Sequence, residues 1–299
     1  TSTVMDSLAA CPNLRCVFLD GNKLSADALR ELANSPTLAV VSVTGCGLTP
    51  DEYLEVARAL PRITLVHPSL REHYAADIAA ADWAAGVGVI SGGYVTYLKK
   101  EYIVPLFQTD VRLTQANVTA EELRQLAALK NVTSLAFDAT GFTEEQVRTA
   151  LESLREYPTL ELFRTDYLPL MKANGLQELS RHTGLHHLTI YGYSNITDEM
   201  LEVLPSLEHL HQLTITSENI TGRIWPLLGK LRELRSVSLQ VNPQLTCKGL
   251  GELRSSPQLK SLSLGKTQVA DADLEPLGDF PELNELRLFA TSISDAGLV

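Results

Sequence analysis

The sequence contains few cysteines, and they show no pairing or metal-binding pattern. Only four occur among 299 residues. None has the C-x-x-C spacing, and they do not cluster at the termini, where a disulfide-bonded cap would need them. Free thiols in a reducing compartment are the simplest interpretation, so we expect a cytoplasmic protein. The four residues are Cys11, Cys16, Cys46 and Cys247.

Secretion remains an open alternative because the chain contains four N-x-T sequons, the acceptor pattern for N-glycans. Three of them lie across a turn, and the repeat described below would place the Asn-[Val/Ile]-Thr pattern there whether or not a glycan is attached. The sequon asparagines are Asn117, Asn131, Asn195 and Asn219.

Positive charge is also scarce. The formal net charge is −11 and the pI is about 5.1. Nucleic-acid binding depends on clustered Lys and Arg, and no run in this chain is basic, so we expect no nucleic-acid partner. The acidic residues fall mainly on expected helices, as in Asp51–Glu52 and Glu121–Glu122. There they suit a solvated outer face, and those in a first turn also suit the helix dipole.

Long apolar runs are absent, and none approaches the roughly 20 residues that a membrane span needs. The most apolar stretch, residues 74–90, is Ala-rich and is interrupted by Asp77 and Asp82. It indicates a packed helix, so we expect no membrane span.

What the chain does contain is an internal repeat, clearest in residues 257–280. Leu259, Leu262 and Leu264 are followed by Val269, and a helical pair comes next. The following unit begins with the same spacing at Leu283. Apolar residues three, two and five positions apart suit a short strand that turns sharply into a second element. One such unit cannot bury its apolar side without neighbours above and below.

The apolar residue after the turn, which we call the turn anchor, identifies ten units. Adjacent regular units are 24 or 25 residues apart. This L-x-x-L-x-L opening with an [IV]-[ST]-D-x-x-L continuation resembles the leucine-rich repeat (LRR) family. The anchors are Leu24, Leu48, Val118, Phe142, Leu170, Ile196, Ile220, Leu245, Val269 and Ile293.

The resemblance implies an α/β solenoid shaped like a horseshoe, with a parallel sheet on the concave face and helices or short helical turns on the convex face. The period and the [ST]-D-x-x-L pattern are most similar to the intracellular branches, which include ribonuclease-inhibitor-like proteins and substrate-recognition arms of ubiquitin ligases. In this family an asparagine before the anchor satisfies backbone groups of the turn. Asn22 fits that role, whereas Cys46, Thr140, Thr267 and Thr291 replace it in other units.

We expect residues 1–299 to form a single LRR domain, part of a longer protein, with regular repeats over 12–60 and 105–299. Residues 61–104 form a degenerate stretch with room for two units. Residues 67–104 should interrupt the solenoid, because residues 71–85 predict an Ala-rich helix where a strand and turn are due. Insertions in solenoids often serve binding.

A lengthened helical side is also expected between Phe142 and Ile196.

Strand residues that alternate with the leucines should face the concave surface. Between Asp110 and Tyr191 these positions combine charges of both signs with an aromatic residue, whereas later units carry mostly Ser and Thr. Arg and Tyr are enriched where binding energy concentrates, so the middle of the face is the predicted binding surface, against the alternative of an undistinguished polar face. The candidate residues are Arg112, Asp138, Arg164, Asp166, His187 and Tyr191.

Five of the seven histidines lie between His182 and His211. His186 and His211 hold equivalent places on adjacent units, about 5 Å apart, where a zinc ion or a pH response is conceivable. Zinc needs three or four ligands and no further ligand is assured, so we expect no metal and treat both as ordinary residues at strand starts.

No catalytic motif is present either. Residues 86–93 read GVGVISGG but lack the Lys of a phosphate-binding loop, so turn or bulge glycines are expected there. The sequence therefore predicts a non-enzymatic scaffold, without cofactor, that binds a protein partner on its concave face. The alternative is a sensory or autoinhibitory LRR domain of a larger multidomain enzyme.

Overall fold

The computed structural model describes residues 5, 7, 8, 10–12, 14–92, 109–129, 132–139, 141–155, 160–166, 176–192 and 196–298. It contains two compact units, each of which is considered by itself. The first comprises residues 1–86, 90–110 and 125–132, and the second comprises 87–89, 111–124 and 133–299. The expectation of one continuous domain over the whole chain stays a prediction.

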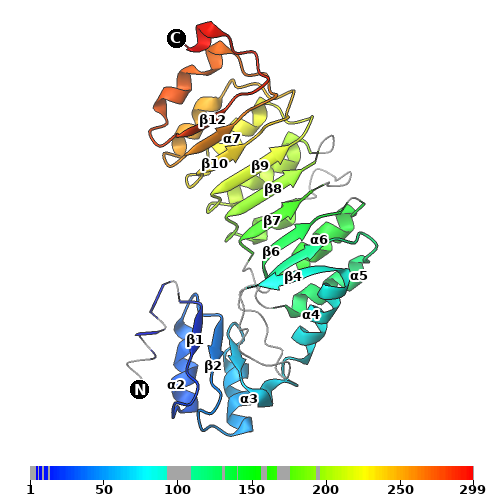
Figure 1. Ribbon diagram of the computed structural model, residues 1–299, viewed down its shortest axis with the longest axis vertical. Coiled ribbons are helices and arrows are strands. Elements are labelled where there is room, and N and C mark those ends of the chain that lie inside the picture. Colours follow the sequence, from blue (N-terminus) through cyan, green and yellow to red (C-terminus); the bar gives the residue numbers. More distant parts are fainter. Residues whose placement is uncertain are drawn as a thin grey trace. The chain divides into compact units, whose positions relative to one another are not determined.

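The first unit is built on a sheet of three short parallel strands in sequence order (Figure 1). Val17, Val41 and Leu65 lie opposite one another across the sheet. The strands are β1 (Cys16–Phe18), β2 (Val40–Ser42) and β3 (Thr64–Val66). The helical segments are α2 (Ala26–Arg30), η1 (Glu31–Asn34), α3 (Pro50–Ala59), η2 (Pro68–Leu70) and α4 (Ala75–Val87).

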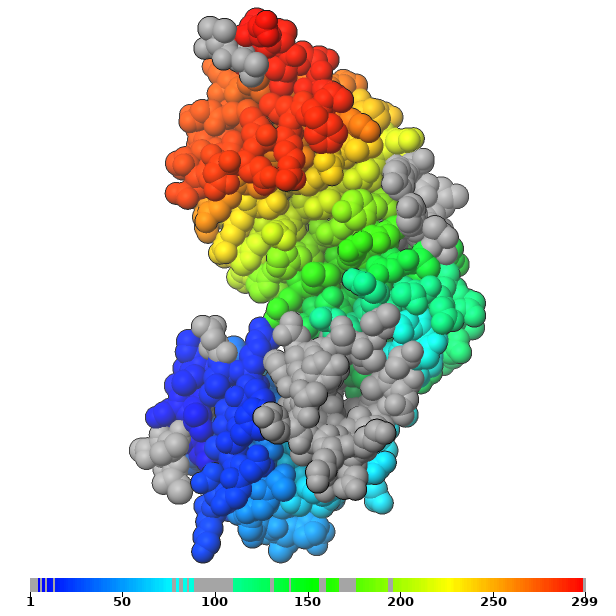
Figure 2. All heavy atoms as spheres, viewed as in Figure 1, coloured from blue at the N-terminus to red at the C-terminus, as the bar shows by residue number. Residues whose placement is uncertain are grey.

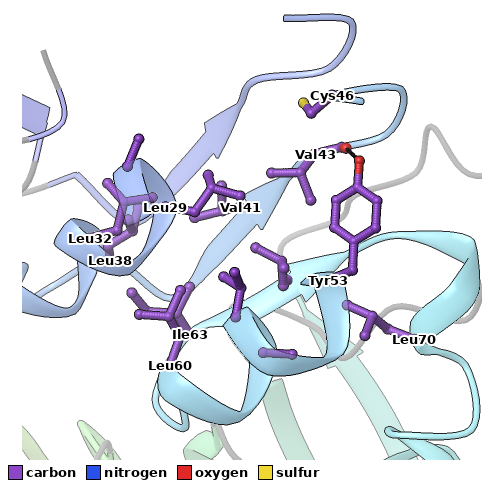
Figure 3. Close-up of a cluster of buried hydrophobic side chains, with 14 of the residues drawn as sticks. Leu29, Leu32, Leu38, Val41, Val43, Cys46, Tyr53, Leu60, Ile63 and Leu70 are labelled. Carbon is purple, nitrogen blue, oxygen red and sulfur yellow. Dashed lines mark hydrogen bonds between the residues drawn. The ribbon is translucent and has the colours of Figure 1, made fainter. Parts of the chain in front are cut away.

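The core of the first unit lies between these strands and α2, η1 and α3 (Figure 3). Leu29 and Leu32 from the helical side and Val41 and Val43 from the strand side are fully buried. Tyr53 is buried among them, and its hydroxyl donates a hydrogen bond of 3.0 Å to the carbonyl of Val43. Helix α3 begins at a capping box, in which Thr49 and Glu52 satisfy each other's backbone N–H groups.

Strand β3 lies inside the stretch that the sequence analysis described as degenerate. The Thr64 N–H donates to the Ala39 carbonyl at 2.7 Å, so β3 continues the ladder of β2. Ile63 and Leu65 are two residues apart, where other units have three, and this one-residue contraction obscures the repeat in the sequence. The expected Ala-rich helix is present as α4, although it begins at Ala75 rather than at residue 71. Residues 93–104 lie outside the described residues.

The second unit is built on a longer sheet, in which neighbouring strands follow the order of the chain from β4 (Gly88–Gly92) to β12. From β6 onward every neighbouring pair is parallel. The other strands are β5 (Thr109–Leu113), β6 (Val132–Phe137), β7 (Leu162–Thr165), β8 (His187–Tyr191), β9 (Gln212–Thr216), β10 (Ser236–Ser238), β11 (Ser261–Ser263) and β12 (Glu285–Arg287).

A row of buried apolar side chains runs across neighbouring strands of this sheet. Leu188 pairs with Phe163 on one side and Leu213 on the other, and the row continues through Val237 and Leu262. Each of these five side chains is at most 1% exposed. Figure 2 shows the successive repeats as adjacent bands of colour, so each layer contacts chiefly its neighbours in sequence.

Helical segments cover the other side of the second unit, and most are short 3₁₀ turns (Figure 1). Pro205 within η5 and Pro276 at the start of η9 remove backbone donors and help to keep these segments short. The segments are α5 (Ala120–Leu123), α6 (Glu144–Ser153), η4 (Gln177–Arg181), η5 (Asp198–Ser206), η6 (Gly222–Ile224), α7 (Trp225–Leu228), η7 (Leu250–Ser255), η8 (Asp271–Asp273), η9 (Glu275–Asp279) and η10 (Asp295–Leu298). The turn η3 (Arg124–Ala128) belongs, apart from Arg124, to the first unit.

The fold is therefore an α/β solenoid of the leucine-rich repeat type, as the sequence predicted. Of the anchors, Val118, Phe142, Ile196, Ile220, Leu245 and Val269 are buried. Leu24, Leu48 and Ile293 are partly buried, and Leu170 lies outside the described residues.

Turn chemistry explains the polar part of the repeat. Asn242, fully buried, donates to the carbonyls of Ile215 at 2.9 Å and Leu239 at 2.6 Å and accepts from the Ser217 N–H at 2.8 Å, so it links two units. Asn242 is not among the turn residues that the repeat pattern predicted. Thr267 and Thr291 donate only to carbonyls three residues before them in their own turns, at 2.5 Å and 2.7 Å. As expected, they satisfy the turn less completely. Thr140 lies outside the described residues.

The [ST]-D pair of the repeat also joins neighbouring units. Asp198 accepts hydrogen bonds from the Thr221 hydroxyl at 2.6 Å and the Thr221 N–H at 3.1 Å. Asp271 accepts the same two bonds from Ser294, at 2.6 Å and 2.7 Å. The aspartate of one unit thus satisfies the Ser or Thr that precedes the helical turn of the next.

Leu262→Ala tests the core row. Leu262 is 0% exposed between two neighbouring strands, and truncating such a side chain should lower the free energy of unfolding by about 2–5 kcal/mol. Chemical denaturation of both proteins measures the difference. Leu286→Ala is the matched control, since Leu286 occupies the same place on β12 but is 41% exposed. A loss at Leu262 no greater than the loss at Leu286 would contradict the assigned core.

Candidate functional site

The face of the second unit's sheet that lies opposite the helices, here called the open face, carries two well-ordered outward columns. Ladder pairing places Ala136, Arg164, Thr189 and Thr214 side by side in the central column. Tyr191 pairs with Thr216 in the distal column. Asp166 joins the distal column because its N–H donates to the Phe137 carbonyl at 3.0 Å, one residue before Asp138.

Arg112 and Asp138 form an ion pair across two neighbouring strands. Arg112 lies on β5, and Asp138 follows β6 directly. The Asp138 N–H donates to the Leu113 carbonyl at 2.9 Å, which fixes the carboxylate next to Arg112. The Nε of Arg112 lies 2.8 Å from Oδ2 of Asp138. The second carboxylate oxygen, Oδ1, is buried and has no hydrogen-bond partner among the described residues.

Arg164 on β7 and Asp166, which directly follows β7, form a second ion pair. The guanidinium donates through Nε to Oδ1 at 2.9 Å and through an Nη to Oδ2 at 2.8 Å, a bidentate geometry. Hydrogen bonding to Asp166 is the main reason that the pKa of Arg164 is raised, and the charges of Asp138 and Tyr191 act in the same direction. Arg164 therefore lies within electrostatic reach of three of the other candidate residues.

His187 and Tyr191 complete the candidate set on β8. Nδ1 of His187 lies 2.6 Å from Oε1 of Gln212 on the next strand. Tyr191 is partly exposed at the end of the same strand, in the column of Asp166. The structure thus brings all six predicted residues onto one face, over strands β5 to β8, and groups Arg112, Asp138, Arg164 and Asp166 most tightly.

The open face has a second aromatic feature that the sequence analysis did not favour. Phe289 follows β12 and is 48% exposed. Its ring lies over Gly265, where an added Cβ would come within 2.3 Å of a ring carbon, so only glycine fits beneath it. Arg287 pairs with Glu285 at 2.6 Å beside it. The signal available in the sequence was the aromatic side chain at an outward position in the last unit.

The histidines cluster where β8 and β9 begin. The rings of His186 and His211 stack with centroids 4.8 Å apart and planes 15° apart. His209 and His211 both approach the same oxygen of Glu233, each at 3.3 Å. Burial and the neighbouring His211 lower the pKa of His186. Among the described residues, no three His, Cys, Asp or Glu side chains are placed to hold a metal ion.

The glycine-rich stretch has a structural explanation. Gly88 begins β4 and packs against β5, where an added Cβ would come within 2.0 Å of the Arg112 carbonyl oxygen. A residue without a Cβ is therefore needed at position 88, because the two backbones approach each other closely there. Gly93 lies outside the described residues. Within the described part of the chain, no helix combines the length and apolar character needed to cross a membrane.

His182 should make stability depend on pH. It is fully buried, its Nε2 lies 3.2 Å from the Leu151 carbonyl, and its Nδ1 has no partner among the described residues. Burial lowers its pKa from 6.5, so below that pH the unfolded chain binds the proton more readily than the folded chain. The free energy of unfolding should therefore fall as the pH drops below 6.5.

Denaturation at several pH values measures this dependence. His182→Gln keeps a donor for Leu151 but does not titrate, so it should flatten the slope and leave a remainder from His186. His187→Gln, on the open face, is the matched control. An unchanged slope in His182→Gln would contradict the assignment.

Comparison with known proteins relates the chain to other repeat structures. No family model matches the sequence, and no curated protein matches it. An internalin from Listeria monocytogenes is similar at 16% identity and a TM-score of 0.44, over 100% of this chain and 86% of the other. The structure of a Rad7–Elc1 complex from yeast matches at 15% identity and 0.34, over 99% and 84%. A TLR13–ssRNA13 complex matches at 16% and 0.40, over 97% and 35%. At these TM-scores the similarity carries no argument about function.

Proposed function

We propose that this chain is a non-enzymatic recognition scaffold that binds a protein partner on the open face of its second unit. The observation that carries the proposal is the pairing of Arg112 with Asp138 and of Arg164 with Asp166 on successive strands, with Tyr191 beside them. This arrangement presents fixed donors, acceptors and a partly exposed aromatic ring on a rigid sheet.

The charges of this surface suit recognition by complementary pairing. Each guanidinium is already opposed by a carboxylate, so the surface holds alternating charges in fixed positions and has little net charge of its own. A partner with the opposite order of charges would displace water from this exposed surface without disrupting the packed core. A partner that placed like charges against these residues would be repelled. Tyr191 adds contact area at small entropic cost.

On this face, Arg112, Arg164 and His187 are each paired with a polar side chain beside them. We further infer that the chain is of the intracellular ribonuclease-inhibitor-like or ubiquitin-ligase-receptor type, on the basis of its 24- or 25-residue period and its [ST]-D-x-x-L pattern.

A reducing, cytoplasmic location is the compartment that we propose. All four cysteines are free. Burial raises the pKa of Cys247 to about 12, so this thiol should be inert. Of the sequon residues, Asn117 is exposed and Asn219 is partly buried, whereas Asn131 and Asn195 lie outside the described residues.

The intact mass of the protein isolated from its own cells tests this compartment. We expect the unmodified mass, with Cys11, which is exposed, labelled first by a thiol reagent and Cys247 labelled only after unfolding. A mass increase that an endoglycosidase removes would show secretion instead.

Arg164→Ala and Tyr191→Ala test the binding surface. A binding hot spot costs about 2 kcal/mol or more when truncated, which is roughly thirtyfold in affinity. A partner captured by wild-type protein should therefore bind each variant far more weakly in calorimetric titration. Ser261→Ala and Ser263→Ala, on the open face of β11, are the controls and should change the affinity little.

Equal affinity of all four variants would contradict the assigned surface. The exposed Phe289 and the described part of residues 67–104 would then be the next surfaces to test.

A further inference from the structure

A second charged surface runs along the edge where the strands of the second unit begin. The residue just before each strand's first open-face position lies in one ladder of backbone hydrogen bonds. His186 N–H donates to the Glu161 carbonyl at 2.8 Å, His211 to His186 at 2.9 Å, Arg235 to His211 at 2.8 Å and Lys260 to Arg235 at 2.8 Å. We call Glu161, His186, His211, Arg235 and Lys260 the strand-start row.

The two fixed cations of this row face no counter-charge among the described residues. Arg235 and Lys260 are exposed on adjacent rungs, about 4.8 Å apart. Within the part of the chain that the structure describes, neither side chain forms an ion pair or hydrogen bond. Other arginines, such as Arg155 and Arg254, are paired with acidic neighbours. Arg235 and Lys260 thus place two like charges side by side in a chain whose net charge is −11.

The histidines extend the row to four rungs of the same sign when they are protonated. His186 and His211 stack directly on one another and precede Arg235. The charged and titratable groups around them are Glu161, His187, His209 and Glu233. Glu233 lies beside His209 and His211. Burial lowers the pKa of His186, so this ring gains a proton only at more acidic pH.

We propose that the strand-start row is a docking surface for an acidic, extended segment of a partner protein. From His186 to Lys260 the row spans three strand spacings, or about 14–15 Å, which an extended peptide covers with four or five residues. Carboxylates on such a segment would lie against Arg235 and Lys260 and complement their charge. The surface is separate from the open face, so docking here does not depend on the function proposed above.

The neighbouring acids favour a peptide over a nucleic acid. Glu161 ends the row, and Glu233 lies beside it. A duplex carries a charge about every 1.7 Å, so it would place phosphates against these carboxylates. A peptide can place its few carboxylates at the cations and leave neutral residues opposite the acids. Docking should also strengthen as the pH falls and the histidines gain charge.

Fluorescence anisotropy of a labelled oligo-aspartate peptide with the full chain tests the proposal, at about 50 mM salt, where screening is modest. Arg235→Ser with Lys260→Ser should weaken binding roughly three- to tenfold, as expected for two exposed charge pairs. Lys230→Ser with Lys248→Ser removes the same charge from exposed positions outside the row and should have little effect.

Two further arms sharpen the result. Wild-type binding should tighten between about pH 7.5 and about pH 5.5, and His186→Asn with His211→Asn should remove that gain. Arg164→Ala with Tyr191→Ala should leave oligo-aspartate binding unchanged, which separates this surface from the open face. Equal losses in the two double-charge variants would overturn the proposal. So would tighter binding of single-stranded DNA with the same dependence on Arg235 and Lys260.

Discussion

The structure depends on the fact that no single repeat can bury its own apolar side. Each strand of the second unit is only three to six residues long, and the backbone groups of the inner strands are satisfied by the strands on either side. The same pairing stacks Leu188, Leu213, Val237 and Leu262 into one buried row. Hydrogen bonding and hydrophobic burial therefore require the same registration, and a shift of one residue would expose the leucines.

That registration also creates the surfaces. Side chains alternate across a strand, so fixing the leucines inward fixes the intervening residues outward. Arg164 and Thr189 are held side by side in this way, and Asp166 lies in the column of Tyr191. The residue before each strand's first outward position is fixed by the same ladder, which is why His211, Arg235 and Lys260 form a straight row. One constraint thus produces a core and two distinct polar surfaces.

The turns show how the repeat accommodates variation. Asn242 joins two units through its side chain, whereas Thr267 and Thr291 satisfy only their own turns. Positive φ at Val241, Lys266 and Ala290 shows that this turn is made without glycine in the last units. Such a conformation is costly for a β-branched residue like Val241. The stacked core of the neighbouring layers holds these turns in place, so their chemistry can vary while the strands stay in register.

The sequence by itself determined the period, the leucine row and the outward positions, because each follows from residue spacing within one unit. It also predicted the Ala-rich helix, since α4 reflects local composition. Strand β3 was missed because one residue fewer separates Ile63 from Leu65 than the pattern requires, and only pairing with β2 reveals the strand. The tertiary structure alone decided which charges meet.

Arg112 reaches Asp138 and His186 stacks on His211 only because their units stack with a particular offset. That offset depends on how the long segments between strands fold, and residue spacing within a unit does not specify it. The same holds for Phe289 over Gly265. It also holds for Arg235 and Lys260, which meet no counter-charge among the described residues of neighbouring layers. Spacing along the chain sets the face on which a side chain lies, and packing between layers sets its neighbours.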